Sequence, residues 1–251
     1  MVQQYLYYGD EFSTNDFTDK KDNPRKNKVY PTDITLFIER YLPEYREDIQ
    51  SGKITEGMFR FPKLKAVHDV DPQILVPFNA VMSLSGEEKA ANIFYHFFVH
   101  DYQFERMWSN PTVYMPFLLR IGRGIGPDFS AYLNMHPTEA IINCCRNRLL
   151  AFYLQLQGIV IIPNVCFGGG ETLTWAFDGL PEDSVLALTT QGCMNDYVAK
   201  RALLNGMHEL VRRKQPEMIY IYGSFPEEWK DKFGVEIRTL PTFSSKWRRN
   251  A

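Results

Sequence analysis

The sequence lacks the features that mark a membrane protein or a general nucleic-acid binder. No uncharged apolar run reaches the roughly 18 residues needed to cross a bilayer, and the polar start MVQQYLYYGDEF lacks the regions of a signal peptide. The formal net charge is only −2, so no overall basic field attracts nucleic-acid phosphates. These absences predict a cytoplasmic protein that has no membrane partner.

Cysteine is scarce, and its spacing does not suggest a metal site. The chain has four cysteines without a CxxC pair, and its five histidines show no ligand spacing that would complete a zinc site. Cys144 and Cys145 are adjacent, so they point to different sides of a helix. We expect buried free thiols, and we predict no cofactor.

The overall composition is that of one folded domain. The chain has 251 residues, of which 45% are hydrophobic and 23% charged, close to the average for globular proteins. Residues 1–32 are mostly polar and are predicted to form an N-terminal segment, followed by a single α/β domain over 33–251. A helix is expected to begin after Thr32 or Asp33, because Ile34, Phe37 and Tyr41 share one helical face.

Seven short apolar runs end in polar or turn residues, and a helix-like stretch follows most of them. This pattern is typical of repeated βα units and a parallel sheet. The predicted fold is therefore α/β and barrel-like, with an open doubly wound sheet as the alternative, because a local pattern does not report closure. The predicted strands are 74–79, 93–100, 124–130, 159–165, 184–190, 218–224 and 235–240.

Two long helices are predicted between these strands. The first runs from Pro137 to just before Gly158, and the second spans about 195–216 with a basic last turn. Arg146 and Arg148 lie on the first of them. Either could hold an anion, and we expect at least one of the two to reach solvent.

Two carboxylates follow successive predicted strands. Asp101 ends FYHFFVH, and Asp128 lies in GPDFS; neighbouring strands are about 4.8 Å apart, so the two groups could form an acid and base pair. Such proximity would leave one of them protonated near neutral pH. The alternative is that both cap helices and have ordinary pKa values.

Other strand ends supply groups that could hold a polar substrate. Asn164 ends an apolar run, and the GGG that follows allows a close backbone approach, although it matches no nucleotide-binding fingerprint. Amide, hydroxyl and small residues end two further strands. The candidates for substrate contact are Ser130, Asn164, Gly168, Gly169, Thr190, Gln191, Tyr222 and Arg146.

Several ordered blocks resemble a bacterial and phage family known as the domain of unknown function DUF4417. They are HDYQFERMWSNP, GPDFSAY, NCCRNRLLAFYLQ, GIVIIPNV, FDGLPEDSV, TTQGC and IYGS, and the resemblance covers roughly residues 70–240. It implies a phage or mobile-element context in a bacterial or phage-infected cell, and it brings no activity with it. The family often has other residue types at the places of His100 and Phe167, so the resemblance implies no catalytic role for either.

Three functions remain open on these observations. The first is an enzyme of hydrolase or glycosyl-transfer type that acts on a nucleoside, nucleotide or sugar-like substrate through Asp101 and Asp128. The second is a non-catalytic module that binds a host protein, nucleic acid or small ligand. The third is hydrolysis with a divalent cation held by Asp101, Asp128 and Asn164, a minimal ligand set. The oligomeric state is left open.

Overall fold

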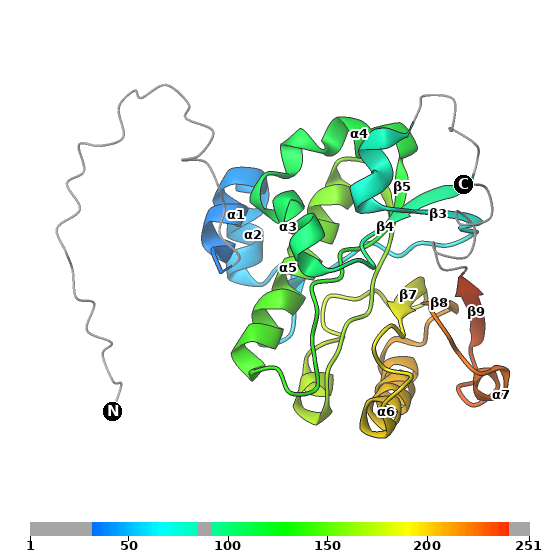
Figure 1. The fold of residues 1–251 in the computed structure, drawn as a ribbon. Coiled ribbons are helices and arrows are strands. Elements are labelled where there is room, and N and C mark those ends of the chain that lie inside the picture. Colours follow the sequence, from blue (N-terminus) through cyan, green and yellow to red (C-terminus); the bar gives the residue numbers. More distant parts are fainter. Residues whose placement is uncertain (1–31, 85–91, 241–251) are drawn as a thin grey trace, which may run out of the picture.

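The computed structural model describes residues 32–84 and 92–240, and it shows a mixed α/β fold with parallel sheets (Figure 1). One sheet has four strands in the order β3-β4-β5-β6, and another has three in the order β7-β8-β9. The strands are β3 (Ile74–Pro77), β4 (Ile93–His96), β5 (Arg123–Ile125), β6 (Val160–Ile162), β7 (Val185–Thr189), β8 (Met218–Tyr222) and β9 (Glu236–Leu240).

A short parallel bridge joins the two sheets between Asn164 and Ala187. The Val165 amide donates to the Ala187 carbonyl at 2.7 Å, and the Ala187 amide donates to the Pro163 carbonyl at 3.0 Å. The spatial order of the strands therefore follows the chain from β3 to β9. Across the described ranges no closed sheet is present, so a closed barrel is not confirmed, and neither sheet contains the order reversal of a doubly wound fold.

The inner faces of the two sheets share one core. Its buried residues come from all seven parallel strands, because side chains alternate between the faces of each strand. Phe98, just after β4, stacks on Tyr222 of β8 with ring centroids 4.9 Å apart. The shared residues are Leu75, Phe94, Phe98, Ile125, Ile162, Val185, Ala187, Met218, Tyr220, Tyr222 and Leu240.

Helices cover the outer faces of the sheets. The two predicted long helices are α5 (Pro137–Leu156) and α6 (Tyr197–Lys214); α6 lies with the second sheet, whereas α1 and α5 pack together beside the first (Figure 1). Asp33 caps α1, as predicted, through a 3.1 Å hydrogen bond from the Leu36 amide. The remaining helices are α1 (Ile34–Tyr41), α2 (Arg46–Ser51), α3 (Asp101–Ser109), α4 (Met115–Ile121) and α7 (Glu227–Lys230).

Short elements connect these layers. A two-stranded antiparallel hairpin precedes the parallel strands, and four 3₁₀ turns lie in the described connections. They are β1 (Thr55–Glu56), β2 (Phe61–Pro62), η1 (Pro43–Tyr45), η2 (Phe78–Ser83), η3 (Pro111–Val113) and η4 (Gly170–Thr174). The predicted polar segment 1–32 lies almost wholly outside the described residues.

Both arginines of α5 are buried, so the expectation that one reaches solvent is wrong. Arg148 is 1% exposed and donates to three carbonyls, those of Asp178 at 3.0 Å, Asn164 at 3.2 Å and Ala176 at 2.7 Å. Arg146 is 4% exposed and paired with Glu105. Buried guanidinium groups need such partners because removing them from water is costly.

Two further observations concern the thiols and the helices. All four cysteines are free; Cys144 is buried and the others are partly buried, which agrees with the prediction of free thiols. Within residues 32–84 and 92–240, no helix combines the length and the hydropathy that a bilayer span requires.

Candidate functional site

The irregular segment 127–130 after β5 is held in place by side chains from three other parts of the chain. Its backbone groups have no strand partners of their own, so each needs a partner elsewhere. Asn147 of α5 binds both polar groups of Phe129: its Oδ1 accepts from the amide at 2.7 Å, and its Nδ2 donates to the carbonyl at 2.9 Å. Asn143 Nδ2, also on α5, donates to the Ser130 carbonyl at 2.9 Å. Asn164 Nδ2 donates to the Pro127 carbonyl at 3.1 Å.

Asp101 is one of these anchors and does not cap its own helix. It is the first residue of α3, whose N-cap is His100 and has no side-chain capping bond. Both carboxylate oxygens of Asp101 instead accept from Ser130, one from the amide at 3.1 Å and the other from the hydroxyl at 3.0 Å. The capping alternative therefore does not describe Asp101, which fixes the far end of the segment.

Arg146 of α5 also contacts the segment 127–130. Its guanidinium carbon lies 3.5 Å from the centre of the Phe129 ring, a cation–π contact, and its NH2 group donates to Glu105 at 2.5 Å. A 3.3 Å bond from Arg146 to the Asn143 amide oxygen links this pair to the anchors on α5. Arg146 thus positions the segment, and its charge is already balanced inside the protein.

Asp128 is the ionisable side chain of the anchored segment 127–130. It is partly exposed, and its Oδ1 accepts from Asn164 Nδ2 at 2.8 Å. Burial raises the pKa of Asp128 from 3.8 to about 7; the Asn164 hydrogen bond opposes the rise, the charge of Asp101 adds to it, and the Cys166 thiol opposes it. Burial, rather than the pairing of two carboxylates expected from the sequence, is the main cause of this raised pKa.

A pocket of about 360 Å³ opens beside Asp128. Its walls come from the loops after β5 and β6, from the last residues of β7 and the loop that follows, and from the first two turns of α6. The pocket therefore lies at the carboxyl ends of the strands, as expected for such folds. The lining residues are Asp128, Ser130, Ala131, Tyr132, Leu133, Asn134, Val165, Cys166, Phe167, Gly168, Leu188, Thr189, Gln191, Gly192, Cys193, Asp196, Ala199, Ala202 and Leu203.

The predicted catalytic and contact residues divide into three groups around this pocket. Ser130, Gly168 and Gln191 line it together with Asp128. Asn164 and Asp101 do not line the pocket, but each is hydrogen-bonded to the segment 127–130. The others, Arg146, Gly169, Thr190 and Tyr222, are not among its lining residues.

Thr190 and Tyr222 are built into the strand ends. Thr190 is 1% exposed, and its hydroxyl donates to the Ser224 carbonyl at 2.9 Å, which ties the ends of β7 and β8 together. Tyr222 is buried and lies against His96, with ring centroids 4.8 Å apart. His96 stays neutral at pH 7 because burial lowers its pKa to about 3.

The glycine loop is close to the protein's own backbone. A Cβ added at Gly168 would lie 2.9 Å from the Tyr132 carbonyl oxygen, and one at Gly169 would lie 3.1 Å from a Leu133 methyl group. The absence of side chains therefore lets this loop close against residues 131–133. Of the two, only Gly168 lines the pocket.

Sequence reasoning missed Asp196, Cys166 and Cys193 as pocket residues. Asp196 follows the end of β7 and caps α6, so the rule that polar residues gather at strand ends would have found it. Burial raises the pKa of both Cys166 and Cys193 above its ordinary value, and the charge of Asp128 adds to each shift. Both thiols are therefore protonated at neutral pH and are poor nucleophiles.

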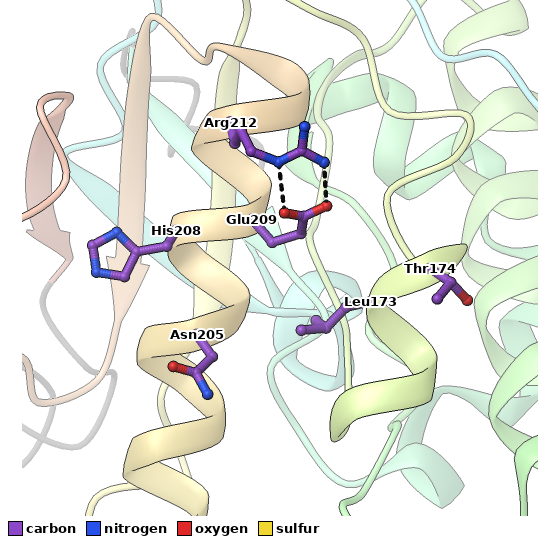
Figure 2. Close-up of a pocket in the computed structure, with 6 residues that line it drawn as sticks. All are labelled: Leu173, Thr174, Asn205, His208, Glu209 and Arg212. Atoms are coloured by element: carbon purple, nitrogen blue, oxygen red, sulfur yellow. Dashed lines mark hydrogen bonds and ion pairs between the residues drawn. The ribbon is translucent and has the colours of Figure 1, made fainter.

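A second hollow of about 440 Å³ lies between α6 and η4 (Figure 2). Its charged groups satisfy one another: Arg212 donates to Glu209 at 2.8 and 2.6 Å, and His208 points away from Leu173 and Thr174 (Figure 2). Because no charge is left to recognise a ligand, we do not take this hollow as the site.

No set of three His, Cys, Asp or Glu side chains in residues 32–84 and 92–240 is placed to hold a metal ion. Asp101 uses both of its carboxylate oxygens on Ser130, and Asn164 directs its amide nitrogen at Asp128. The cation hypothesis based on Asp101, Asp128 and Asn164 gains no support from this geometry.

Comparison with known proteins identifies relatives but no activity. A family model described as "Domain of unknown function (DUF4417)" matches residues 54–241. The chain is 31% identical over 196 residues to the Gene 1 protein of Mycobacterium phage D29, covering 75% of this chain and 72% of the relative. It is 32% identical over 154 residues to the Gene 1 protein of Mycobacterium phage L5, covering 61% and 67%. No solved structure matches.

Proposed function

The chain belongs to the DUF4417 family, and we propose that it is an enzyme of hydrolase or glycosyl-transfer type. Its substrate in this proposal is a small nucleoside-, nucleotide- or sugar-like compound bound in the pocket beside Asp128. Asp128 gives and takes the proton, and Asp101 is a positioning residue because Ser130 occupies both of its oxygens.

One observation carries the proposal: an anchored carboxyl group with a pKa of about 7 faces a pocket of small-molecule size. A general acid or base works best when its pKa lies near the operating pH. Holding such a group partly buried costs stability, and proteins keep costs of this kind mainly at functional sites. The anchoring of segment 127–130 supplies the fixed geometry that proton transfer needs.

The proposed chemistry is cleavage of a glycosidic bond. Protonated Asp128 donates its proton to the departing oxygen or nitrogen while the bond from that atom to the sugar carbon breaks. Water or another hydroxyl then adds to the carbon, and ionised Asp128 accepts the proton that this nucleophile loses. The carboxyl group returns to its starting state, so no oxidant or reductant is required.

Two finer statements accompany this proposal. We propose that the seven parallel strands form one open, barrel-like arrangement, supported by their sequential order, the Asn164–Ala187 bridge and the shared inner core. We also propose that the protein acts in the cytoplasm of an infected bacterial cell, which its phage relatives support.

A non-catalytic binding role is the second candidate, and exposed aromatic side chains favour it. Tyr102, Tyr132 and Tyr197 are 76%, 59% and 77% exposed. Each lies in the stretch that follows a parallel strand, after β4, β5 and β7 respectively. Exposed tyrosines are frequent in binding surfaces. Tight binding of a partner that survives loss of the Asp128 carboxyl group, without turnover, would favour this candidate.

The test is turnover by purified protein on a panel of nucleosides, nucleotides and glycosides. Asp128→Asn keeps an oxygen that accepts from Asn164 but cannot transfer a proton. We expect its rate on any substrate to fall by about 10²–10⁴-fold. Glu228→Gln makes the same chemical change on the exposed face of α7 and should leave the rate unchanged. Full activity of a folded Asp128→Asn variant would exclude the proposed role.

A further inference from the structure

We infer that the pocket beside Asp128 takes an uncharged nucleoside and discriminates against its phosphorylated form. The inference rests on the proposed function for the location of the site, and it narrows the substrate to one of the three classes named there. It depends on the charges in and around the pocket, on the start of α6, and on the size and polarity of the walls.

The pocket walls carry acidic groups and no basic group. Asp128 and Asp196 both line the pocket, and none of its described lining residues is Lys, Arg or His. A phosphate dianion bound here would be repelled by any carboxylate that is ionised, and no cation in the walls would offset this repulsion. Phosphate sites usually contain Arg or Lys for that purpose.

Both guanidinium groups of α5 are committed elsewhere. Arg146 pairs with Glu105 and covers the Phe129 ring, and Arg148 donates to three backbone carbonyls. Both side chains are nearly inaccessible, at 4% and 1% exposed. Recruiting either for a phosphate would leave buried polar groups without partners, which is unfavourable.

The start of α6 is a feature of the pocket that would suit an anion, and a carboxylate of the protein itself already occupies it. The helix is 18 residues long, and free amides at such a helix start attract phosphate. Here the Asp196 carboxylate accepts from the Ala199 amide at 2.7 Å. The protein therefore places its own negative charge where a phosphate would otherwise bind.

Size and wall chemistry fit a nucleoside. About 360 Å³ lies near the lower end of the range of roughly 300–1,000 Å³ for small-ligand pockets, too small for a polymer. Phe167, Tyr132 and Leu133 are among the lining residues, and aromatic and apolar residues of this kind suit a flat base. Gln191 and Asn134 offer amide donors and acceptors for the polar edge of a base or for sugar hydroxyls.

The test compares matched ligands by calorimetry at pH 8, where Asp128 is ionised. Adenosine and uridine are titrated against adenosine and uridine 5′-monophosphate with the full chain. We expect at least one nucleoside to bind roughly tenfold or more tightly than its monophosphate. Equal or tighter binding of the monophosphates would overturn the inference, and so would binding of neutral glycosides with no nucleoside binding.

Two variants separate this inference from the proposed function. Asp196→Asn removes the charge but keeps a good helix cap, so the preference for the nucleoside should shrink severalfold. Glu228→Gln should leave the preference unchanged. A preference that is the same in Asp196→Asn and in the wild type would overturn the electrostatic argument. Full turnover by a folded Asp128→Asn variant would instead exclude the catalytic role of Asp128, whichever ligand the pocket prefers.

Discussion

Replacing Asp128 with Asn should make the protein more stable above neutral pH. In the folded protein the pKa of Asp128 is about 7, against the ordinary value of 3.8. The folded state therefore binds the proton more tightly than the unfolded state does. The stability that protonated Asp128 provides is complete below pH 3.8 and is lost as the pH rises to about 7. Asparagine keeps the bond from Asn164 and carries no charge that must be buried.

The size of the effect follows from the pKa difference. One pKa unit corresponds to about 1.4 kcal/mol, so the whole difference is worth about 4 kcal/mol at most. Between pH 5 and pH 8 the free energy of unfolding of Asp128→Asn, relative to wild type, should rise by about 2–3 kcal/mol. The comparison with wild type cancels the contributions of other titrating groups to the free energy of unfolding. This holds provided that the side chains facing residue 128 keep their positions, namely Asp101, Asn164, Cys166 and Cys193.

The assay is urea unfolding of both proteins at several pH values from 5 to 8, with Glu228→Gln as the exposed control. The control should follow the wild-type curve at every pH. A difference between Asp128→Asn and wild type that stays constant across this range would mean that Asp128 has an ordinary pKa. The reasoning behind the site would then be wrong.

Three further substitutions probe the surroundings of the site. Arg146→Ala leaves a partly buried carboxylate without its partner and should lower the free energy of unfolding by about 3–5 kcal/mol in urea. Gly206→Ala should cost about 1–3 kcal/mol and weaken ligand binding, because the added Cβ would lie 2.0 Å from the Phe167 ring, which lines the pocket. Asn164→Ala should raise the pKa of Asp128 above about 7, measured by carboxyl NMR, because it removes a hydrogen bond to the ionised form.

Two of these substitutions have matched controls. Arg212→Ala removes an exposed ion pair and should change stability by less than about 1 kcal/mol. Gly170→Ala adds a Cβ with no atom within 4 Å and should be close to neutral. If each variant behaved like its control, the packing described around Phe129 and Phe167 would be wrong. A lowered pKa of Asp128 in Asn164→Ala would contradict the role given to Asn164.

The sequence predicted the repeated strands well and their ends poorly. Each of the seven apolar runs overlaps a strand, because strands buried on both faces read as nearly continuous apolar runs. The run 124–130 was predicted as one strand, yet β5 ends at Ile125. Phe129 and Ser130 of this run bind side chains of α5, and Pro127 and Asp128 bind Asn164. Such long-range anchors leave no local pattern. Whether the sheets close around one centre likewise depends on distant contacts.

The candidate site could be predicted in kind but not in the role of each residue. Asp128 and Asn164 come together as expected, since both follow neighbouring parallel strands. The contacts of Asp101 with Ser130 could not be read from the sequence, since a helix cap and a loop anchor have the same local pattern. Arg146 looked free because its partners, Glu105 and Phe129, lie in other segments of the chain.

The most direct test of this account is the pKa of the Asp128 carboxyl group in the folded protein. A ¹³C NMR titration of aspartate carboxyl groups, with the Asp128 signal assigned by its loss in Asp128→Asn, measures it without any substrate. The account predicts a midpoint near pH 7, raised by burial beside the pocket. A midpoint near 4 would show that Asp128 is an ordinary solvated carboxylate and would contradict its proposed role in proton transfer.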